Sequence, residues 1–408
     1  MVHHTMATSS TSANRASSKI RPMTSTLLRC VMTALIVGTL AACTTPPAPS
    51  PSSSGALVPP PAVPAAAPLA GDDRPLPAPI VQPKSRWVPV RWAELPGFQE
   101  DALHEAWNAW IRSCERPVAA FVALCVEVRQ LSIATPQEQR AWMVSRLQPY
   151  RVETLEGAAE GLLTAYYEPF LDAARQPGNG FDVPLYRLPA GFGQRKPWYT
   201  RQQIDTLPEA KAALQGRAIA WVRDPIEALV LHIQGSGRLR ITEPDGGTTL
   251  VRVAFAGTND QPYQSVGRWL LDQGLTRDAT WPGIREWLAQ NPHRTQELLW
   301  SNPRYVFFRE EPLPPLDAQF GPRGAQGVPL TPGRSIAVDR LSIPYGTPVW
   351  LASPGPQAAL QRLVLAQDTG SAIVGAVRAD YFTGWGPEAG DLAGRLKQPL
   401  RLWVLWPR

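Results

Sequence analysis

The stretch that decides the fold runs AVDRLSIPYGTPVWLASPGPQAALQRLVLAQDTGSAIVGAVRADYFTGWGPEAG (residues 337–390), and it contains three aspartates. Asp339 precedes a turn-rich I-P-Y-G-T segment, Asp368 ends an apolar run at a D-T-G turn, and Asp380 follows a second apolar run. Short apolar runs bounded by glycine turns predict strands. A carboxylate at a strand end is held rigidly at a surface, which acid–base chemistry requires.

The remainder of the chain has a large hydrophobic fraction and an ordinary charge balance. Of its 408 residues 44% are hydrophobic, which is enough for the cores of two or three domains. Residues 1–42 hold four basic side chains and no acidic one, so the formal net charge of +6 falls to +2 for the rest. A nucleic-acid binder would carry a concentrated basic stripe, so the charge distribution argues against that class.

Residues 1–42 have the features of a signal peptide. The apolar run VMTALIVGTLAA that ends at Ala42 is too short to span a membrane. Residues 40–43, L-A-A-C, resemble a bacterial lipobox, which implies cleavage before Cys43 and acylation of its thiol. Thr44 replaces the aspartate associated with inner-membrane retention, which favours an outer-membrane lipoprotein facing the periplasm. The alternative is a plain secretory signal in which Cys43 is incidental.

Residues 43–84 are dominated by proline, alanine and serine. Such a composition cannot bury a core, and proline favours an extended, semi-stiff chain. We therefore expect a lipid-anchored tether that holds the folded body away from the membrane.

The body, from Ser85 onward, begins with helical patterns and continues with short strands. Apolar residues at helical spacing in residues 98–111 and a proline start at Pro136 predict helices. From Gly161, β-branched and aromatic runs alternate with turn clusters, interrupted by helical patterns between residues 263 and 290. Many short strands with few long helices indicate barrels rather than a doubly wound sheet.

Cysteines and histidines in the body are few. In an oxidising periplasm, Cys114 and Cys125 can form a disulfide, and the alternative is two buried free thiols. His104, His232 and His293 are widely spaced and form no metal-binding pair on one helix turn, so we expect no zinc or iron site and no cofactor. Carboxylates are therefore the best candidates for chemistry.

The D-T-G-S sequence at residues 368–371 is also the local signature of aspartic proteases. Those enzymes need two such aspartates sharing one proton, and this chain contains no second D-[ST]-G. A homodimeric protease would therefore be required. The structural alternative is that Asp368 only caps a turn, assisted by Thr369.

Several longer motifs resemble one family in collinear order. The C-terminal stretch resembles the three-aspartate domain of bacterial cell-wall enzymes, and the central stretch resembles the neighbouring domain of the membrane-bound lytic murein transglycosylase A family. The resemblance covers roughly residues 85–408. Its motifs include GLLTAYYEPFLDAARQPGNGFDVPLYRLP (161–189), HIQGSGRLRI (232–241), FAGTNDQPYQSVGRWLLDQG (255–274), NPRYVFFRE (302–310) and GVPLTPGRSIAVDR (327–340).

The resemblance implies cleavage of the β-1,4 bond between N-acetylmuramic acid and N-acetylglucosamine in peptidoglycan. The muramyl 6-hydroxyl attacks the anomeric carbon, which leaves a 1,6-anhydro end. One carboxylic acid can protonate the leaving oxygen and then, as a carboxylate, accept the proton of the 6-hydroxyl. A hydrolase normally needs a second carboxylate, whereas here the sugar supplies its own nucleophile.

By motif position, the resemblance maps the catalytic acid–base to Asp380. Asp368 becomes its neighbour, able to raise the pKa of Asp380 by charge repulsion or to hold its surroundings by hydrogen bonds, and it is also the alternative acid. Asp339 is expected to be structural. The chain departs from the usual D-T-G-G-A-I-K-G pattern at Ser371 and Val374, which predicts an altered substrate contact or pKa rather than lost activity.

Expected substrate contacts come from the Y-Y-E-P segment, the Q-G-S-G-R turn and the G-W-G turn. Aromatic faces stack on sugar rings, and amides and hydroxyls bond N-acetyl groups. Core packing is the alternative for each tyrosine, and Glu168 is also a third candidate acid. The candidate residues are Tyr166, Tyr167, Glu168, Gln234, Ser236, Arg238 and Trp385.

The family fold implies two domains around a substrate groove. Residues 85–170 and 300–408 would form a double-psi β-barrel catalytic domain, and residues 171–299 a smaller inserted, barrel-like domain. Expected partners are glycan strands, outer-membrane lipid and other cell-wall enzymes, without nucleic acid. Two rival functions remain: a carboxylate-dependent cell-wall hydrolase and a noncatalytic peptidoglycan-binding lipoprotein.

Overall fold

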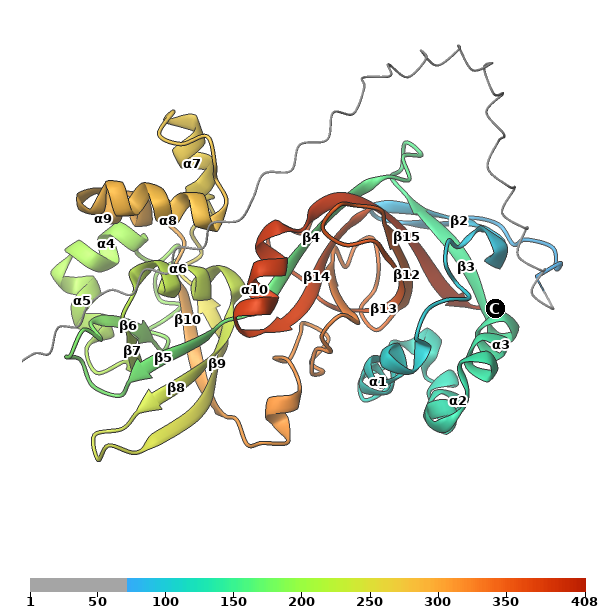
Figure 1. Cartoon of the computed structure of the whole chain (residues 1–408), viewed down its shortest axis with the longest axis horizontal. Coiled ribbons are helices and arrows are strands. Elements are labelled where there is room, and N and C mark those ends of the chain that lie inside the picture. Colours follow the sequence, from blue (N-terminus) through green and yellow to red (C-terminus); the bar gives the residue numbers. More distant parts are fainter. Residues whose placement is uncertain (1–71) are drawn as a thin grey trace, which may run out of the picture. The chain divides into compact units, whose positions relative to one another are not determined.

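The computed structural model describes residues 72–408 (Figure 1). The expected signal peptide, Cys43 and most of the expected tether lie outside these residues. The strands are β1 Ile80–Gln82, β2 Ser85–Pro89, β3 Leu147–Glu153, β4 Gly161–Glu168, β5 Phe170–Ala174, β6 Val183–Tyr186, β7 Ala218–Val222, β8 Ser236–Thr242, β9 Thr248–Thr258, β10 Val306–Pro312, β11 Ser335–Val338, β12 Pro348–Ser353, β13 Leu360–Asp368, β14 Arg378–Trp385 and β15 Lys397–Pro407. The α-helices are α1 Leu103–Ser113, α2 Leu124–Gln130, α3 Pro136–Arg146, α4 Arg201–Thr206, α5 Pro208–Leu214, α6 Pro225–Gln234, α7 Val266–Asp272, α8 Trp281–Gln290, α9 Thr295–Trp300 and α10 Gly386–Arg395, joined by five short 3-10 segments, among them η5 Asp317–Gln319.

Nine strands form the larger sheet in the order β1-β2-β3-β15-β12-β13-β11-β14-β4. A further pairing between β4 and β15 closes six of them, β15, β12, β13, β11, β14 and β4, into a barrel. Strand β15 can do this because it is 11 residues long. Its first residues pair with β4, and its later residues pair with β12 and β3.

The barrel has an apolar interior and a helical cover. Side chains from the barrel strands, such as Ile336, Leu351 and Leu402, are fully buried in one cluster. Helices α1, α2 and α3 pack through a second cluster, in which Trp107 and Trp110 meet apolar side chains of β12, β13 and β15. These tryptophans lie on one face of α1 because they are three residues apart.

The segment from β5 to β10 builds a second sheet of six strands in the order β10-β9-β8-β5-β7-β6. Helix α6 covers this sheet, with Ala228 and Leu231 buried against Leu239 and Val253. Asp224 caps the start of α6, and Gly235 ends it with φ +82, a left-handed conformation that glycine adopts without strain.

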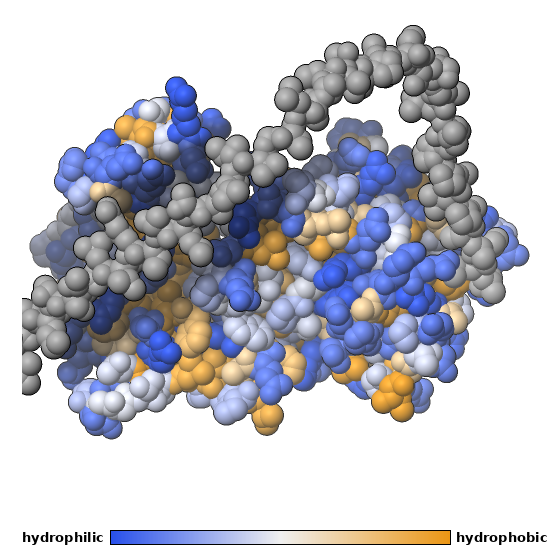
Figure 2. All heavy atoms as spheres, in the orientation of Figure 1, coloured by the Kyte–Doolittle hydropathy of each residue, from blue (hydrophilic) through white to orange (hydrophobic). Residues whose placement is uncertain are grey.

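The mostly β architecture with helices and two separate sheets confirms the expected fold class. Strand β1 lies inside the segment expected to be a tether and pairs with β2, so ordered backbone begins before Ser85. None of the helices within residues 72–408 is long and apolar enough to cross a membrane. Figure 2 shows a face on which hydrophilic residues are interspersed with smaller hydrophobic areas.

Candidate active site

The sheet register places two of the three aspartates in one row. Strand β11 lies between β13 and β14, and Ala337 on β11 is the register partner of both Asp368 and Asp380. Asp380 is in turn paired with Thr164 on β4. Because neighbouring strands are about 4.8 Å apart, the Cα atoms of the two aspartates lie roughly 10 Å apart. The two carboxylates therefore share one end of the barrel.

Asp380 is partly exposed and has one side-chain hydrogen-bond donor among residues 72–408. The Thr164 hydroxyl donates to its Oδ1. The Arg378 guanidinium donates to the same hydroxyl oxygen, Nη2 to Oγ1 at 2.8 Å. Burial raises the pKa of Asp380, while the Thr164 hydrogen bond and the charge of Arg378 act in the opposite direction. A carboxyl group in this setting can exist in both protonation states.

Asp368 is held on both oxygens. Its Oδ2 accepts from the Tyr166 hydroxyl at 2.9 Å, and its Oδ1 accepts from the backbone N–H of Ala325 at 2.9 Å. Burial is the largest cause that raises the pKa of Asp368 to about 6, and the negative charge of Asp380 adds to the rise. The negative charge of Asp380 thus raises the pKa of Asp368, whereas the pKa of Asp380 is shifted by burial, Thr164 and Arg378. The expected effect of Asp368 on the pKa of Asp380 stays a prediction.

Asp339 has contacts of a structural residue. It is 7% exposed, pairs with Lys84 at 2.9 Å, and accepts from the backbone N–H groups of Leu341 and Gly375. These bonds lower its pKa despite burial. They fix the loop that follows Asp368, in which Val374 is 58% exposed.

Glu168 and Arg238, both expected to contact substrate, are buried in an ion cluster instead. Glu168 is 0% exposed and accepts from Arg238 Nε at 2.8 Å and from Arg252 Nε at 2.5 Å. Both guanidinium groups also donate to the carbonyl of Phe320. The cluster leaves no accessible surface on Glu168, so that residue is neither a substrate contact nor an acid in this structure.

The other expected substrate residues surround this cluster and the aspartates. Tyr166 reaches Asp368, as described above. The backbone N–H of Tyr167 donates to the side-chain oxygen of Gln234 at 3.1 Å, and Ser236 is 8% exposed at the start of β8. The Arg238 guanidinium lies over the ring of Trp385, and its Cζ atom is 3.9 Å from the centroid of that ring. Among Tyr166, Tyr167, Gln234, Ser236 and Trp385, Tyr166 alone is hydrogen-bonded to Asp368 or Asp380.

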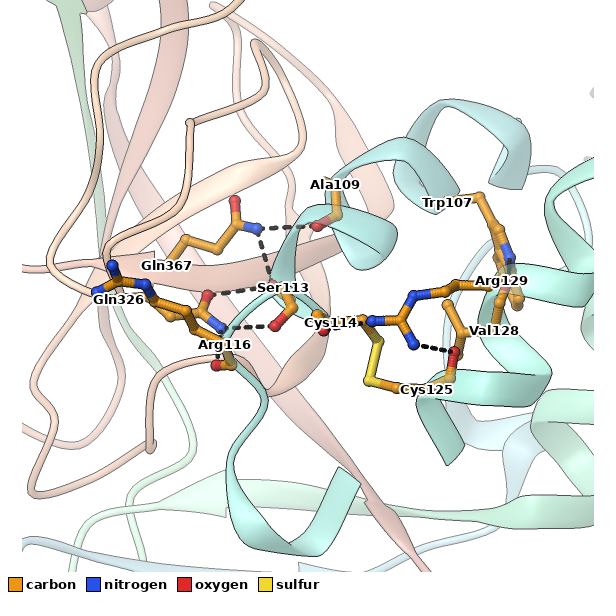
Figure 3. The surroundings of a disulfide bond; sticks show 10 residues. All are labelled: Trp107, Ala109, Ser113, Cys114, Arg116, Cys125, Val128, Arg129, Gln326 and Gln367. Carbon is orange, nitrogen blue, oxygen red and sulfur yellow. Dashed lines mark hydrogen bonds between the residues drawn. A yellow bond between two sulfur atoms is a disulfide. The ribbon is translucent and has the colours of Figure 1, made fainter. Parts of the chain in front are cut away.

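A disulfide between Cys114 and Cys125 joins the end of α1 to α2 (Figure 3). The same helix end is bonded to the barrel through Gln367, whose Nε2 donates to the Ala109 carbonyl at 2.9 Å and to Ser113 Oγ at 2.8 Å. Gln367 immediately precedes Asp368. The disulfide therefore supports the segment that carries one of the two aspartates.

Thr164 and Arg378 were missed as site residues in the sequence. Their signal was present, because Thr164 precedes the Y-Y-E-P segment by two residues and Arg378 precedes Asp380 by two. Residues i and i+2 of a strand share a face, so Thr164 and Tyr166 point to the same side. The pairing of β4 with β14, more than 200 residues away, could not be read from the sequence.

Two cavities, of about 630 and 520 Å³, lie beside β6, β7 and the helices α4, α5 and α6, and neither is lined by Asp339, Asp368 or Asp380. Within residues 72–408, no three His, Cys, Asp or Glu side chains gather as a metal site.

Comparison with known proteins identifies the family. Residues 162–309 match the MltA specific insert domain, and residues 334–406 match the 3D domain. The residues that match the insert domain include most of β4, although β4 itself belongs to the barrel.

Relatives match in sequence and in structure. A membrane-bound lytic murein transglycosylase A of Vibrio cholerae is 33% identical over 60% of this chain and 65% of its own length, slightly under two thirds. The Escherichia coli K12 protein of the same name is 32% identical over 63% of this chain and 68% of its own. The solved lytic transglycosylase LtgG of Burkholderia pseudomallei is 43% identical, with a TM-score of 0.57 over 82% of this chain and 98% of that one. The chain belongs to the membrane-bound lytic murein transglycosylase A family and carries a C-terminal 3D domain.

Proposed function

We propose that this protein is a peptidoglycan lytic transglycosylase, cleaving the bond between N-acetylmuramic acid and N-acetylglucosamine with formation of a 1,6-anhydro end. The observation that carries the proposal is the setting of Asp380. It is a partly exposed carboxyl group at a barrel end, its pKa is raised by burial, and only its Oδ1 accepts a hydrogen bond from a described residue. The related proteins named lytic murein transglycosylases support the same reaction class.

Asp380 acts as acid and then as base. Its protonated form donates the proton to the glycosidic oxygen as the bond to the anomeric carbon breaks. The carboxylate then accepts the proton of the muramyl 6-hydroxyl as that oxygen bonds to the anomeric carbon. The proton count balances, and no water enters the product. One group can serve both steps because the intramolecular nucleophile is already in place.

Asp368 has a supporting role in this proposal. Both of its oxygens are occupied by protein donors, whereas Asp380 Oδ2 has no hydrogen-bond donor among residues 72–408. A group that must approach a glycosidic oxygen needs an unoccupied oxygen of its own. Geometry therefore favours Asp380 as the proton donor, although Asp368 has a pKa raised to about 6.

The glycan would lie in a groove between the barrel domain and the inserted domain. The sheet of the inserted domain runs from β5, which begins at Phe170, to β10, which ends at Pro312, so it extends beyond the expected bounds of residues 171–299. Tyr167, Gln234, Ser236 and Trp385 are its proposed contacts. Acyl chains on Cys43 would anchor the protein to the outer membrane, facing the periplasm. Relatives are named membrane-bound lytic murein transglycosylase A, which supports attachment to a membrane.

Mass spectrometry of digested sacculi tests the reaction. The wild-type enzyme should release muropeptides with anhydro ends, and Asp380→Asn should lower their release at least about 100-fold, because an amide cannot donate and recover the proton. Asp317→Asn is the matched control, since Asp317 is exposed and distant in sequence from both aspartates.

Two outcomes would contradict the proposal. Products heavier by one water would show a hydrolase, which is the first rival function. Sacculi that remain intact with the wild-type enzyme, or an Asp380→Asn variant as active as the Asp317→Asn control, would remove the proposed role of Asp380 and favour the noncatalytic alternative.

A further inference from the structure

Arg378, Thr164 and Asp380 form a chain of hydrogen bonds across two parallel strands. Arg378 and Asp380 lie two residues apart on β14, and Thr164 lies opposite Asp380 on β4. Arg378 Nη2 is 2.8 Å from Thr164 Oγ1, and that hydroxyl bonds to Asp380 Oδ1. Arg378 is itself fixed by hydrogen bonds from Nη1 to the carbonyls of Leu162 and Ala379.

The direction of these bonds follows from their chemistry. A guanidinium can only donate, so Thr164 Oγ1 must accept from Arg378. A hydroxyl has one proton, and this proton is then free to point to Asp380 Oδ1. The carboxylate accepts it, because an ionised carboxylate has no proton to give. Arg378 therefore fixes the orientation of the hydroxyl, and the hydroxyl fixes the orientation of the carboxylate.

We propose that Arg378 is a positioning residue that acts through Thr164, setting both the orientation and the proton affinity of Asp380 while leaving Oδ2 free for the substrate. The proposal rests on the proposed function, because it assigns a role within that reaction.

As an acid Asp380 must release a proton, and as a base it must take one up. The hydrogen bonds from Arg378 through Thr164 to Asp380 can balance these two requirements. Burial alone favours the protonated acid and would make the carboxylate hold its proton too tightly. The Thr164 bond and the Arg378 charge favour the ionised base. A proton affinity between these limits suits a group that must give a proton and then take one.

Other charged groups lie on the elements around Asp380, and α10, which packs against β4 and β14, carries Glu388, Asp391 and Arg395. Asp368 on β13 and Tyr166 on β4 both interact electrostatically with it. On β15, Lys397 is the register partner of Thr164 and is exposed. On β11 the partner of Asp380 is Ala337, which carries no charge. Among these groups, Arg378 is the cation that is linked to Asp380 by hydrogen bonds, through the Thr164 hydroxyl.

The test compares pH profiles of anhydro-muropeptide release for Thr164→Val, Thr164→Ser, Arg378→Gln and the control Arg401→Gln. Arg401 is 54% exposed and pairs with the exposed Glu160, so it serves as an arginine outside the chain of hydrogen bonds to Asp380. Thr164→Val and Arg378→Gln should move the alkaline limb up by about one pH unit, because the protonated acid persists to higher pH without these groups. Their maximal rates should fall about 10-fold or more. Thr164→Ser keeps the hydroxyl and should resemble the wild type, as should Arg401→Gln.

A lower rate with an unmoved alkaline limb in both Thr164→Val and Arg378→Gln would overturn the proposal, since a merely structural role changes stability and not the limb. Circular dichroism and thermal melting check that each variant folds, and if Arg378→Gln does not fold, the contrast between Thr164→Val and Thr164→Ser decides. An absence of anhydro products from the wild type would overturn the proposed function itself. If the wild type forms anhydro products and the alkaline limbs of Thr164→Val and Arg378→Gln coincide with that of the wild type, only the role of Arg378 and Thr164 is overturned.

Discussion

Burial raises the pKa of Asp368 to about 6, whereas an unfolded aspartate titrates near its ordinary value of 3.8. Between these values, the folded protein holds a proton that the unfolded chain has released. The contribution of Asp368 to the free energy of unfolding is therefore fully present below pH 3.8 and is lost as the pH rises through 6. At neutral pH the buried negative charge destabilises the fold.

Asp368→Asn should accordingly change stability in a pH-dependent way. Relative to the wild type, the variant should gain stability between pH 4 and pH 8, by an upper bound of roughly 3 kcal/mol for a shift of about two pH units. Urea denaturation at both pH values measures this gain. A difference between variant and wild type that is the same at pH 4 and pH 8 would contradict the raised pKa of Asp368.

At the residue scale, the sequence identified the aspartates but not their hydrogen-bond donors. Asp339, Asp368 and Asp380 are visible because each stands beside a turn. Glu168 was misjudged because its segment gives no sign that two arginines from distant strands enclose it. Thr164 and Arg378 stand close in sequence to predicted site residues, yet their contact depends on a strand pairing that only the fold reveals.

The link between α1 and α2 gives a prediction at the element scale. Cys114 and Cys125 are 11 residues apart, so their disulfide restricts a short loop in the unfolded chain. Replacing both with alanine should lower the free energy of unfolding by about 2–3 kcal/mol. Urea denaturation checks this, with wild-type protein in reducing buffer as a second comparison. Equal midpoints for oxidised and reduced protein would show that the bond adds no stability.

Element types were easier to predict than element partners. Helix α3 begins at Pro136 after Thr135, as expected, because proline fits the first helical turn and the Thr135 hydroxyl caps it. Strand β15 contains the apolar run LRLWVLW at residues 400–406. Its three partners, β3, β12 and β4, could not be foreseen, because an apolar run shows that a strand is buried and not which strand lies beside it.

At the scale of the whole molecule, Glu168 connects the two sheets. It ends β4 of the barrel and binds arginines from β8 and β9 of the second sheet. Glu168→Gln should lower the free energy of unfolding by about 3–5 kcal/mol, because Arg238 and Arg252 would remain buried without a compensating charge. Glu160→Gln, which breaks an exposed pair with Arg401, should cost less than about 1 kcal/mol. Similar losses in the two variants by urea denaturation would contradict this role of Glu168.

The class of fold was predictable because short strands and turn clusters dominate the body, and the detailed architecture came from the family resemblance. The closed ring of six strands was beyond composition and periodicity. It depends on pairings such as β4 with β14 and β4 with β15, which join segments more than 200 residues apart.

The position of β15 in the barrel has a consequence for biosynthesis. Thr164 is made early by the ribosome, Asp380 emerges late, and β15, which closes the ring beside β4, follows Asp380. A nascent chain that has not yet released Lys397–Pro407 cannot assemble the row of Thr164, Asp380 and Asp368 in a closed barrel. The activity proposed above would therefore require that β15 has been made and paired with β4, because β15 follows both aspartates in the chain.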